Sequence, residues 1–335
     1  MPPTPILASI VIPTYQRCAD IVTALQALDR QTLPPERFEV IVVVDGSSDG
    51  TLEAVRAHRP RYSLKALWQA NSGRAAARNA GIALAGGSIV ILLDDDMLPE
   101  PDWLHAHVEA HAGRAGYGVL GPVPVIMDSA SPLTVDYIGP KFAEHLTRLA
   151  AMSETIQPWD AYSGNFSVER AALEKVGRFD EAFQDYGNED VDLFHRLQCA
   201  GITLTYAPAA AARQRYSKGF PALAADTRAK GKTAVLFAIK HPDVAADSRL
   251  GRFENHSLQW RLTRALLVRL GRAWPGLMEG LLGFMARLER RRPTFLGVYY
   301  GFVLDCFFWL GAFDALDVYR KAGRPLPDLL RRLGR

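Results

Sequence analysis

Residues 88–103 read SIVILLDDDMLPEPDW, an apolar run that ends abruptly in three aspartates, Asp94, Asp95 and Asp96. Adjacent carboxylates repel one another, so this pattern at the end of a strand is most easily explained if a cation or several backbone donors compensate the charge. Side chains alternate along an extended chain, which predicts that Asp94 and Asp96 project to one side, away from Asp95. The stretch indicates a hard-metal site, with a solvated acidic turn as the alternative.

The composition is that of an ordinary globular protein. The chain has 335 residues, of which 48% are hydrophobic and 22% charged, and this indicates one large catalytic domain with an appendage, or two domains. A net charge of +3 is too small to indicate a nucleic acid partner. Cys18, Cys199 and Cys306 are widely separated, which is typical of a reducing compartment and gives no zinc or disulfide spacing. The first residues lack the pattern of a signal peptide or membrane span, so we expect a cytoplasmic catalytic part.

Strand-like and helix-like segments alternate along the first half of the chain. Strands are expected at residues 7–12, 38–44, 62–68 and 89–93, and helices after Asp20, at 52–58 and at 73–85. Asp20 is expected to cap its helix. Continuous Val, Ile and Leu strands separated by helices predict an α/β fold, a mostly parallel sheet with helices on both faces.

Polar residues follow the carboxyl ends of these strands, where ligands bind in such sheets. They are the segment Pro13 to Arg17, which includes Tyr15, then Asp45, and then the aspartate triplet. We expect the three loops to converge on one crevice. Asp45 is suited to accept hydrogen bonds from a base or a ribose hydroxyl, although DGSSDG also fits an Asx turn.

The helix expected at 73–85 carries two cations one turn apart, Arg74 and Arg78, with Asn71 and Gly73 near its start. Cations and backbone N–H groups at a helix start suit anionic ligand groups, and a solvated basic helix face is the alternative. Together with the loops above, this pattern predicts a nucleotide-diphosphate site.

Other phosphate and metal motifs are not supported. No G-x-G-x-x-G follows a strand, which argues against a dinucleotide-binding fold. Residues 231–233 (Gly-Lys-Thr) resemble the end of a P-loop, but no strand precedes them, and we expect a helix surface there. His107 and His111 have the spacing of zinc ligands, but HVEAH lacks a glutamate directly after the first histidine, and an exposed helix is expected.

A second informative block spans residues 162–201. Gly164 and Asn165 lie in a strand-like stretch where a ligand could approach the backbone. Glu189 and Asp190 precede a helix with apolar residues at helical spacing. Acidic residues there either complement the helix dipole or supply the base that a reaction needs.

Four ordered blocks of the sequence resemble those of the family 2 glycosyltransferases, which have the GT-A fold. They are SIVIPTYQR (9–17), VVVDGSSDGT (42–51), NSGRAAARNAG (71–81) with LLDDDMLP (92–99), and GNFSVERAALEKVGRFDEAF (164–183) with NEDVDLFHRL (188–197). The resemblance covers about residues 9–216 and is weaker to about residue 242. It implies inverting transfer of a sugar from a nucleotide-diphospho sugar to an acceptor hydroxyl, in glycan or glycolipid biosynthesis of the cell envelope.

The resemblance also implies roles for single residues. Asp45 would contact the base, and Asp94 the ribose or the metal-bound diphosphate. Asp96 would bind Mn2+ or Mg2+, and Asp190 of the Glu189–Asp190 pair would be the catalytic base. The full donor-binding set expected is Pro13, Tyr15, Arg17, Asp45, Asn71, Arg74, Arg78, Asp94, Asp95, Gly164 and Asn165, with Asp94, Asp96 and Gln214 as metal ligands.

Two features depart from the family pattern. Many relatives have a metal-binding histidine where this chain has Arg213, Gln214 and Arg215. Gln214 could supply an oxygen ligand, or Arg213 could replace part of the cation's role. The Gln-x-x-Arg-Trp pattern of processive synthases is absent, so single additions are expected.

The C-terminal part differs in composition. We expect residues 1–242 to form the glycosyltransferase domain and residues 243–335 a helical region. A basic cluster, Arg290 to Arg292, precedes TFLGVYYGFVLDCFFWLGAF (294–313), an apolar aromatic stretch interrupted by Asp305. This pattern indicates an anchor at an anionic membrane surface, suited to a lipid-linked acceptor, or a helical cap on the catalytic domain or on a second subunit.

Two other functions fit part of the pattern. A metal-dependent nucleotidyltransferase could share the sheet and the carboxylates, but a Gly-rich loop with arginine is expected after its first strand, where this chain has PTYQRCAD. A non-catalytic sugar-nucleotide-binding protein would result if the altered metal shell is disabling. Only a glycosyltransferase would release a nucleoside diphosphate.

Overall fold

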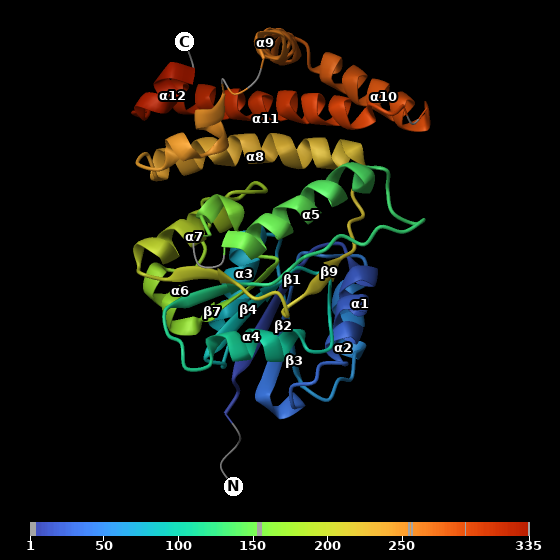
Figure 1. The fold of residues 1–335 in the computed structure, drawn as a ribbon, viewed down its shortest axis with the longest axis vertical. Helices are drawn as coiled ribbons and strands as arrows, with labels where there is room; N and C mark the ends of the chain where they lie inside the picture. Colours follow the sequence, from blue (N-terminus) through green and yellow to red (C-terminus); the bar gives the residue numbers. More distant parts are fainter. Residues whose placement is uncertain (1–4, 153–155, 254, 256, 292, 334–335) are drawn as a thin grey trace. The chain divides into compact units, whose positions relative to one another are not determined.

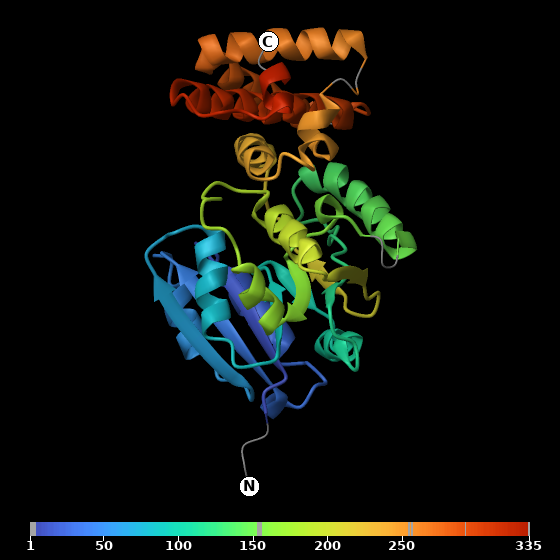
Figure 2. The same cartoon turned by 90° about the vertical axis from the view of Figure 1, so that its left-hand side faces the viewer.

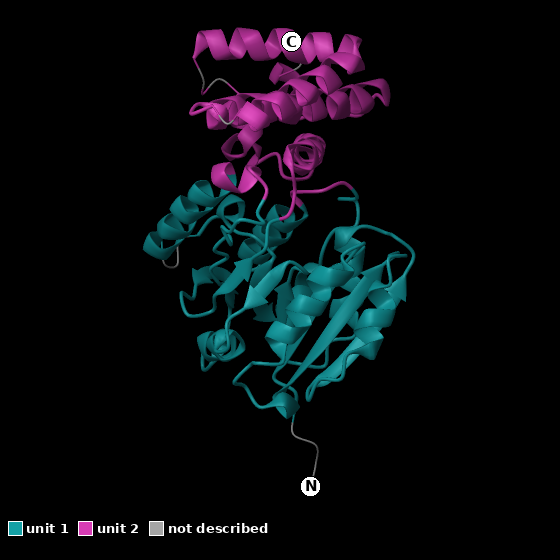
Figure 3. Ribbon diagram, turned by 90° about the vertical axis from the view of Figure 1, so that its right-hand side faces the viewer, with its two compact units in different colours: residues 1–131, 138–184, 189–216 teal, residues 132–137, 185–188, 217–335 magenta. Residues whose placement is uncertain are grey.

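The computed structural model describes residues 5–152, 156–253, 255, 257–291 and 293–333 (Figure 1). The chain divides into two compact units (Figure 3). Unit 1 comprises residues 1–131, 138–184 and 189–216, and unit 2 comprises residues 132–137, 185–188 and 217–335. The domain boundary expected near residue 242 stays a prediction, although the helix over 220–240 groups with the C-terminal helices.

Unit 1 contains nine strands and the helices around them. The strands are β1 (Ala8–Thr14), β2 (Phe38–Asp45), β3 (Ser63–Gln69), β4 (Ile89–Leu93), β5 (Met97–Pro99), β6 (Tyr117–Leu120), β7 (Asn165–Glu169), β8 (Thr203–Tyr206) and β9 (Ala212–Gln214) among the described residues. The helices are α1 (Cys18–Leu28), α2 (Thr51–Ala57), α3 (Arg74–Ala83), α4 (Trp103–His111), most of α5 (Thr134–Met152), α6 (Arg170–Val176) and α7 (Glu189–Cys199).

The main sheet has the strand order β3-β2-β1-β4-β7-β6-β8, and β5 pairs with β9 separately. Strands β3, β2, β1 and β4 are parallel neighbours, with Ile10 opposite both Val40 and Ile91. The predicted mostly parallel sheet with helices is thus confirmed. Strand β7 is antiparallel to both β4 and β6, which the sequence pattern did not predict.

Alternation along each strand divides the core of unit 1 between the two faces of the sheet. Ile10 and Ile12 of β1 pack with residues of α1, whereas Val11 packs with residues of α3 and α7. All three side chains are fully buried. Because both faces are covered, the central strands are mostly apolar, with a buried Ser9–Glu39 hydrogen bond near their amino ends and the other polar residues at their carboxyl ends.

The start of α1 differs from the expectation. The helix begins at Cys18, whose backbone N–H donates to Asp49 Oδ2 across 3.0 Å, so Asp20 lies in the first turn and is not the cap. Asp49, which lies in the loop after β2, thus accepts a hydrogen bond from a backbone N–H at the start of α1. The Asp20 carboxylate instead lies 3.6 Å from Arg17 Nη1.

The histidines of α4 also differ from the expectation of an exposed helix. His107 is fully buried between Ser167 Oγ and Asn165 Oδ1, each 2.9 Å from a ring nitrogen, and His111 Nε2 lies 2.9 Å from the same Ser167 hydroxyl. Burial lowers the pKa of both imidazoles to about 4, which keeps them neutral at physiological pH. The two histidines are therefore internal hydrogen-bonding groups of unit 1.

Unit 2 is helical, as predicted for the C-terminal region. Its main helices are α8 (Phe220–Lys240), α9 (Leu258–Ala273), α10 (Pro275–Arg291), α11 (Leu296–Lys321) and α12 (Asp328–Leu333) among the described residues. Helix α11 lies between α8 on one side and α9 with α10 on the other (Figures 1 and 2). Arg292 of the predicted basic cluster lies outside the described residues.

Helix α11 is the helix in the described part of the chain that is long and apolar enough to cross a membrane, yet 61% of its apolar window is buried within the protein. It crosses α8 at close range: a Cβ at Gly231 would lie 1.9 Å from the Phe308 carbonyl oxygen. Gly231 is buried at this crossing and Thr233 is buried beside Asn188, so the expectation that residues 231–233 form a helix surface is wrong.

Asp305, the charge within the apolar stretch of α11, is the centre of a buried polar cluster in unit 2. Its Oδ2 accepts hydrogen bonds from Trp260 Nε1 at 2.9 Å and Arg264 Nη1 at 3.1 Å. Its Oδ1 accepts from Arg249 Nη2 at 3.0 Å and Trp309 Nε1 at 3.1 Å. Burial alone would raise the pKa of Asp305, but the Trp260 N–H and the two arginines outweigh it and the pKa is lowered.

Candidate functional site

The aspartate triplet lies in a turn after β4. Asp94 Oδ1 accepts from Arg78 Nη2 at 2.8 Å, while Asp95 Oδ1 and Asp96 Oδ2 lie 3.5 and 3.2 Å from Arg17 Nη1. The structure differs from the expected alternation in one respect, because Asp95 does not project away from Asp96 but contacts the same guanidinium. The extended strand ends at Leu93, and the turn directs Asp95 and Asp96 toward the same cation.

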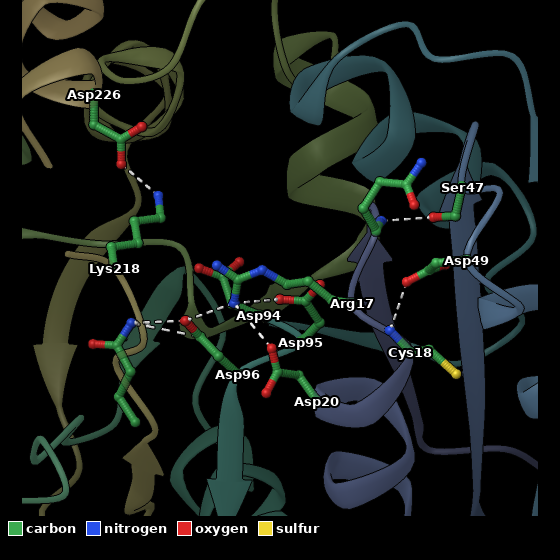
Figure 4. A network of polar contacts seen from close by, with 12 residues as sticks. Arg17, Cys18, Asp20, Ser47, Asp49, Asp94, Asp95, Asp96, Lys218 and Asp226 are labelled. Carbon is green, nitrogen blue, oxygen red and sulfur yellow. Dashed lines mark hydrogen bonds and ion pairs between the residues drawn. The ribbon is translucent and has the colours of Figure 1, made fainter. Parts of the chain in front are cut away.

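Arg17 lies among three carboxylates, those of Asp20, Asp95 and Asp96 (Figure 4). Burial raises the pKa of Asp95 to about 7, with Arg17 acting against the rise and Asp96 adding to it. Burial and the charge of Asp94 also raise the pKa of Asp96, again against Arg17. A single guanidinium thus leaves this group of carboxylates short of positive charge.

Arg78 joins two distant segments of the chain. Its Nη2 donates to Asp94, and its Nη1 lies 3.2 Å from Glu189 Oε1, the first residue of α7. The Arg78 side chain is only 2% exposed, so it faces these carboxylates and not solvent. Burial alone would raise the pKa of Asp94, but Arg78 and then Arg74 outweigh it and the pKa is lowered. The end of β4 and the start of α7 are therefore tied together.

Asp45 fixes the loop that leads into α3. Its Oδ1 accepts from Gln69 Nε2 at 2.8 Å and from the Ser72 N–H at 2.9 Å, and its Oδ2 accepts from the Gly73 N–H at 3.0 Å. The carboxylate is nearly buried. Asp45 thus determines where α3, with Arg74 and Arg78, begins.

The loops after β1 and β2 are bonded to each other. The Gln16 N–H donates to Ser47 Oγ at 2.8 Å, beside the Cys18 to Asp49 bond (Figure 4). A Cβ at Gly46 would lie 2.7 Å from the backbone nitrogen of Asn71, so the loop before α3 packs directly against the loop after β2. The expected convergence of these loops is present. Pro13 is half-buried here, and Tyr15, Asn71 and Arg74 are exposed.

Gly164 contacts the aspartate triplet, whereas the side chain of Asn165 points into the interior of unit 1. The Asp94 N–H donates to the Gly164 carbonyl at 3.1 Å, and a Cβ at Gly164 would lie 2.7 Å from Asp94 Oδ2, so only glycine leaves this carboxylate in place. Asn165 is fully buried. Its Oδ1 accepts from Trp103 Nε1, and its Nδ2 donates to the carbonyls of Pro122 and Ala210. The Asn165 side chain therefore has an internal supporting role, and the approach of a ligand to the backbone here stays a prediction.

The acidic pair at the start of α7 has one buried and one half-buried member. Glu189 is 4% exposed, and among the described residues its Oε2 is a buried oxygen without a hydrogen-bond partner. Asp190 is half-buried, and its Oδ1 accepts from the Val191 N–H at 2.9 Å. A helix N-terminus favours negative charge, which suits Asp190 as an ionised carboxylate.

The carboxylates fit a divalent cation held jointly with a ligand's phosphates. Gln214 Nε2 lies 3.3 Å from Asp96 Oδ2, which places this side chain of β9 beside Asp96. Within the described residues, no group of three His, Cys, Asp or Glu side chains is gathered to bind a metal. Mg2+ commonly takes only one or two carboxylates plus substrate phosphates, so Asp96 with one neighbouring carboxylate would be enough. The site therefore suits a metal that arrives with an anionic ligand.

Sequence reasoning missed several residues that build this site. Ser47 and Asp49 hold the loop after β1, and Asp20 joins the Arg17 cluster. Ser47 and Asp49 belong to DGSSDGT, a sequence typical of loops that bond to neighbouring backbone, and this signal could have indicated their contacts. No pattern in the sequence indicated that Arg78 and Glu189 pair.

Comparison with known families gives a direct match. Residues 9–177, just over half of the chain, match the model described as Glycosyl transferase family 2. The chain belongs to this family. Residues 144–218 also match the model described as the N-terminal domain of galactosyltransferase.

Relatives of this family 2 chain include validoxylamine A glucosyltransferase of Streptomyces hygroscopicus subsp. limoneus, which is 35% identical over 223 residues. That match covers 59% of this chain and 49% of the relative. Glycosyltransferase AglE of Haloferax volcanii is 32% identical over 202 residues, covering 59% of this chain and 64% of the relative. This chain thus spans about half the length of the first of these relatives.

A solved structure shows the same fold. The mannosyltransferase PcManGT from Pyrobaculum calidifontis, in complex with GDP-Man and Mn2+, superposes with a TM-score of 0.60 at 21% identity, covering 90% of this chain and 87% of that one. The expected GT-A fold is thus confirmed for this family 2 chain.

Proposed function

We propose that this chain transfers a sugar from a nucleotide-diphospho sugar to an acceptor hydroxyl, with inversion at the anomeric carbon and one addition per encounter. The observation that carries the proposal is the Asp94–Arg78–Glu189 contact. It unites the carboxylates after β4 with the acidic start of α7, as a reaction between a bound donor and an acceptor hydroxyl requires.

The donor would bind at the converging loops. Asp45 shapes the base pocket by holding the backbone before α3, and Pro13, Tyr15 and Asn71 line it. The exposed Arg74 supports the diphosphate, since its charge already acts on Asp94. Arg17 and Asp95 sit beside them, whereas the buried Arg78 orients Asp94 and Glu189 without touching the donor.

The metal would be Mn2+ or Mg2+, held by Asp96 with Asp94 and by the amide oxygen of Gln214. When bound, a divalent cation stabilises the negative charge that develops on a departing diphosphate. The mannosyltransferase with the same fold is described in complex with GDP-Man and Mn2+, which supports this choice of donor class and metal.

Asp190 would be the catalytic base. As the acceptor oxygen forms its bond to the anomeric carbon, the bond from that carbon to the phosphate oxygen breaks, and the electron pair leaves with the nucleoside diphosphate. The acceptor hydroxyl proton passes to the Asp190 carboxylate. Glu189, held by Arg78, fixes the first turn of α7 and with it the position of Asp190.

The setting of the reaction follows from the family and the cysteines. We propose a glycan or lipid-linked acceptor, of the kind used for cell envelope polysaccharides, and a cytoplasmic catalytic domain over residues 1–242. The three cysteines are free thiols, which agrees with a reducing compartment.

The test begins with donor selection. Purified protein is screened for thermal stabilisation by UDP-, GDP-, ADP- and dTDP-sugars, with and without Mn2+, because selective binding raises apparent stability. The selected donor is then incubated with candidate acceptors, and the released products are identified.

A released nucleoside diphosphate supports the transferase. Release of pyrophosphate from a sugar phosphate and a nucleoside triphosphate would instead identify a nucleotidyltransferase. Donor binding without any product, across acceptors that include lipid-linked sugars, would identify a sugar-nucleotide-binding protein.

A further inference from the structure

Helix α9 has an inverted distribution of polar and apolar residues. Its buried face includes Arg264, which is 1% exposed, whereas Leu258, Leu262 and Leu266 are 67%, 62% and 57% exposed. Residues four apart lie on one face of a helix, so these three side chains form one row, called here the α9 leucine row. A helix that buries an arginine and exposes a leucine row is expected to have that row covered in the working protein.

The orientation of α9 is fixed from within unit 2. Trp260 and Arg264 on its inner face both donate to Asp305 of α11, and Val268 packs into the same core. Helix α9 lies on the side of α11 away from α8 (Figures 1 and 2). The leucine row therefore cannot rotate into the core without breaking the buried Asp305 cluster.

Apolar exposure is concentrated in this part of unit 2. Among the described residues, nine of the thirteen exposed large hydrophobic side chains belong to residues 258–318. Trp274, directly after α9, is 66% exposed. Phe284 of α10 and Phe295 each lie within 6.3 Å of the Tyr299 ring, measured between centroids. Such aromatic side chains are typical of the boundary between water and lipid.

Charge distinguishes between the possible occupants of the row. Helices α9 and α10 carry seven arginines and two glutamates. Arg269 is exposed and lies on the same face as Leu262 and Leu266. In a two-fold symmetric dimer, the leucine row of one copy would face the same row of the other copy. The arginines around the two rows would then repel each other, which disfavours this dimer. An anionic bilayer surface offers both the apolar phase and the opposite charge.

We propose that the α9 leucine row, with Trp274 and the arginines around it, binds the surface of an anionic lipid bilayer. Helix α11, the longer and more apolar helix, serves as the core that presents this face. The inference assigns the membrane contact to a different helix from the one that the apolar stretch alone would indicate. It is independent of the transferase reaction, because none of these residues belongs to the proposed donor site.

The test is vesicle flotation of the full chain. Wild-type protein is expected to float with vesicles of phosphatidylcholine and phosphatidylglycerol, far less with phosphatidylcholine alone, and less as salt is added. The triple variant Leu258→Gln, Leu262→Gln and Leu266→Gln is expected to lower binding by about tenfold or more. A control variant, Leu84→Gln with Met127→Gln, changes apolar residues of unit 1 that are 43% and 56% exposed, and it should bind like wild type.

Circular dichroism and light scattering accompany each variant. All variants are expected to keep the wild-type helix content, since every changed side chain is exposed. Equal flotation of the triple variant and the wild type would overturn the proposal, as would a wild type that floats with neither vesicle. A wild-type dimer that the triple variant converts to a monomer, without vesicle binding, would assign the row to a second copy instead.

Discussion

Arg78 Nη1 lies 3.2 Å from Glu189 Oε1, although the two residues are 111 positions apart in the sequence. Both side chains are almost fully buried, so each compensates a charge that would otherwise be costly inside unit 1. The same guanidinium also holds Asp94. The arrangement makes one buried cation responsible for the position of two acidic segments.

Replacing Arg78 should therefore affect both stability and function. Arg78→Met leaves Glu189 and Asp94 without their partner and is expected to cost about 3 to 5 kcal/mol of unfolding free energy, measured by urea denaturation. Adding Glu189→Gln should recover part of this loss, because one buried charge is removed as well. Arg74→Met, which changes an exposed arginine one turn earlier, is the control and should cost much less. Equal stability of the two single variants would contradict the role given to Arg78.

Gly164 is expected to tolerate no side chain. The added methyl group of Gly164→Ala would lie 2.7 Å from Asp94 Oδ2, so this carboxylate must move. The expected result is weaker donor binding, measured by titration calorimetry, with a smaller effect on stability. Gly280→Ala in α10 meets open space and serves as the control. Unchanged donor affinity in Gly164→Ala would argue against Asp94 as part of the donor site.

The buried histidines predict a pH dependence of stability. His107 and His111 have pKa values of about 4 in the folded protein, below the usual value of 6.5. The unfolded chain therefore takes up protons first as the pH falls. The stabilising contribution is complete above pH 6.5 and is lost between 6.5 and 4, by about 3 kcal/mol per histidine.

The measurement is the unfolding free energy as a function of pH. The charge of Arg114 lowers the pKa of His111, and His111 lowers that of His107, so Arg114 and His111 are kept unchanged. His107→Gln keeps a hydrogen-bonding side chain but cannot titrate, so it should remove roughly half of the loss of stability in this range and leave the share of His111. An equally steep curve in the variant would show that other groups cause the acid sensitivity.

Asp305 should be essential to unit 2. Asp305→Asn removes the negative charge between Arg249 and Arg264 and is expected to destabilise the protein by about 3 kcal/mol in thermal or urea unfolding. Asp314→Asn changes a partly exposed aspartate in the same helix and is expected to have little effect. Similar losses in both variants would remove the special role of the buried cluster.

Much of the fold could be predicted because its signals are local. Continuous β-branched strands, an aspartate triplet at a strand end and small residues before α3 each follow from short-range chemistry. The antiparallel position of β7 in the main sheet and the ion pair between Arg78 and Glu189 depend on contacts between segments far apart in the sequence. No local pattern encodes such contacts. The expected separation of Asp95 from Asp96 failed because the strand ends at Leu93 and both carboxylates contact Arg17.

Polarity alone misled the predictions for several buried residues. His107 and Thr233 are polar, and residues of their kind are often found on surfaces. Both are buried with hydrogen bonds that only the folded chain supplies. The leucine row of α9 is the opposite case, since apolar spacing predicts a helix but not which face the rest of the chain will cover.

The most direct test of the central claim uses Asp190→Asn. The claim is that acidic residues from β4 and α7 act on one donor and one acceptor, so the variant should bind the selected nucleotide sugar as tightly as wild type. Its rate of nucleoside diphosphate release to acceptor should fall by about 10² to 10⁴-fold. Turnover at the wild-type rate, with donor binding intact, would contradict the account.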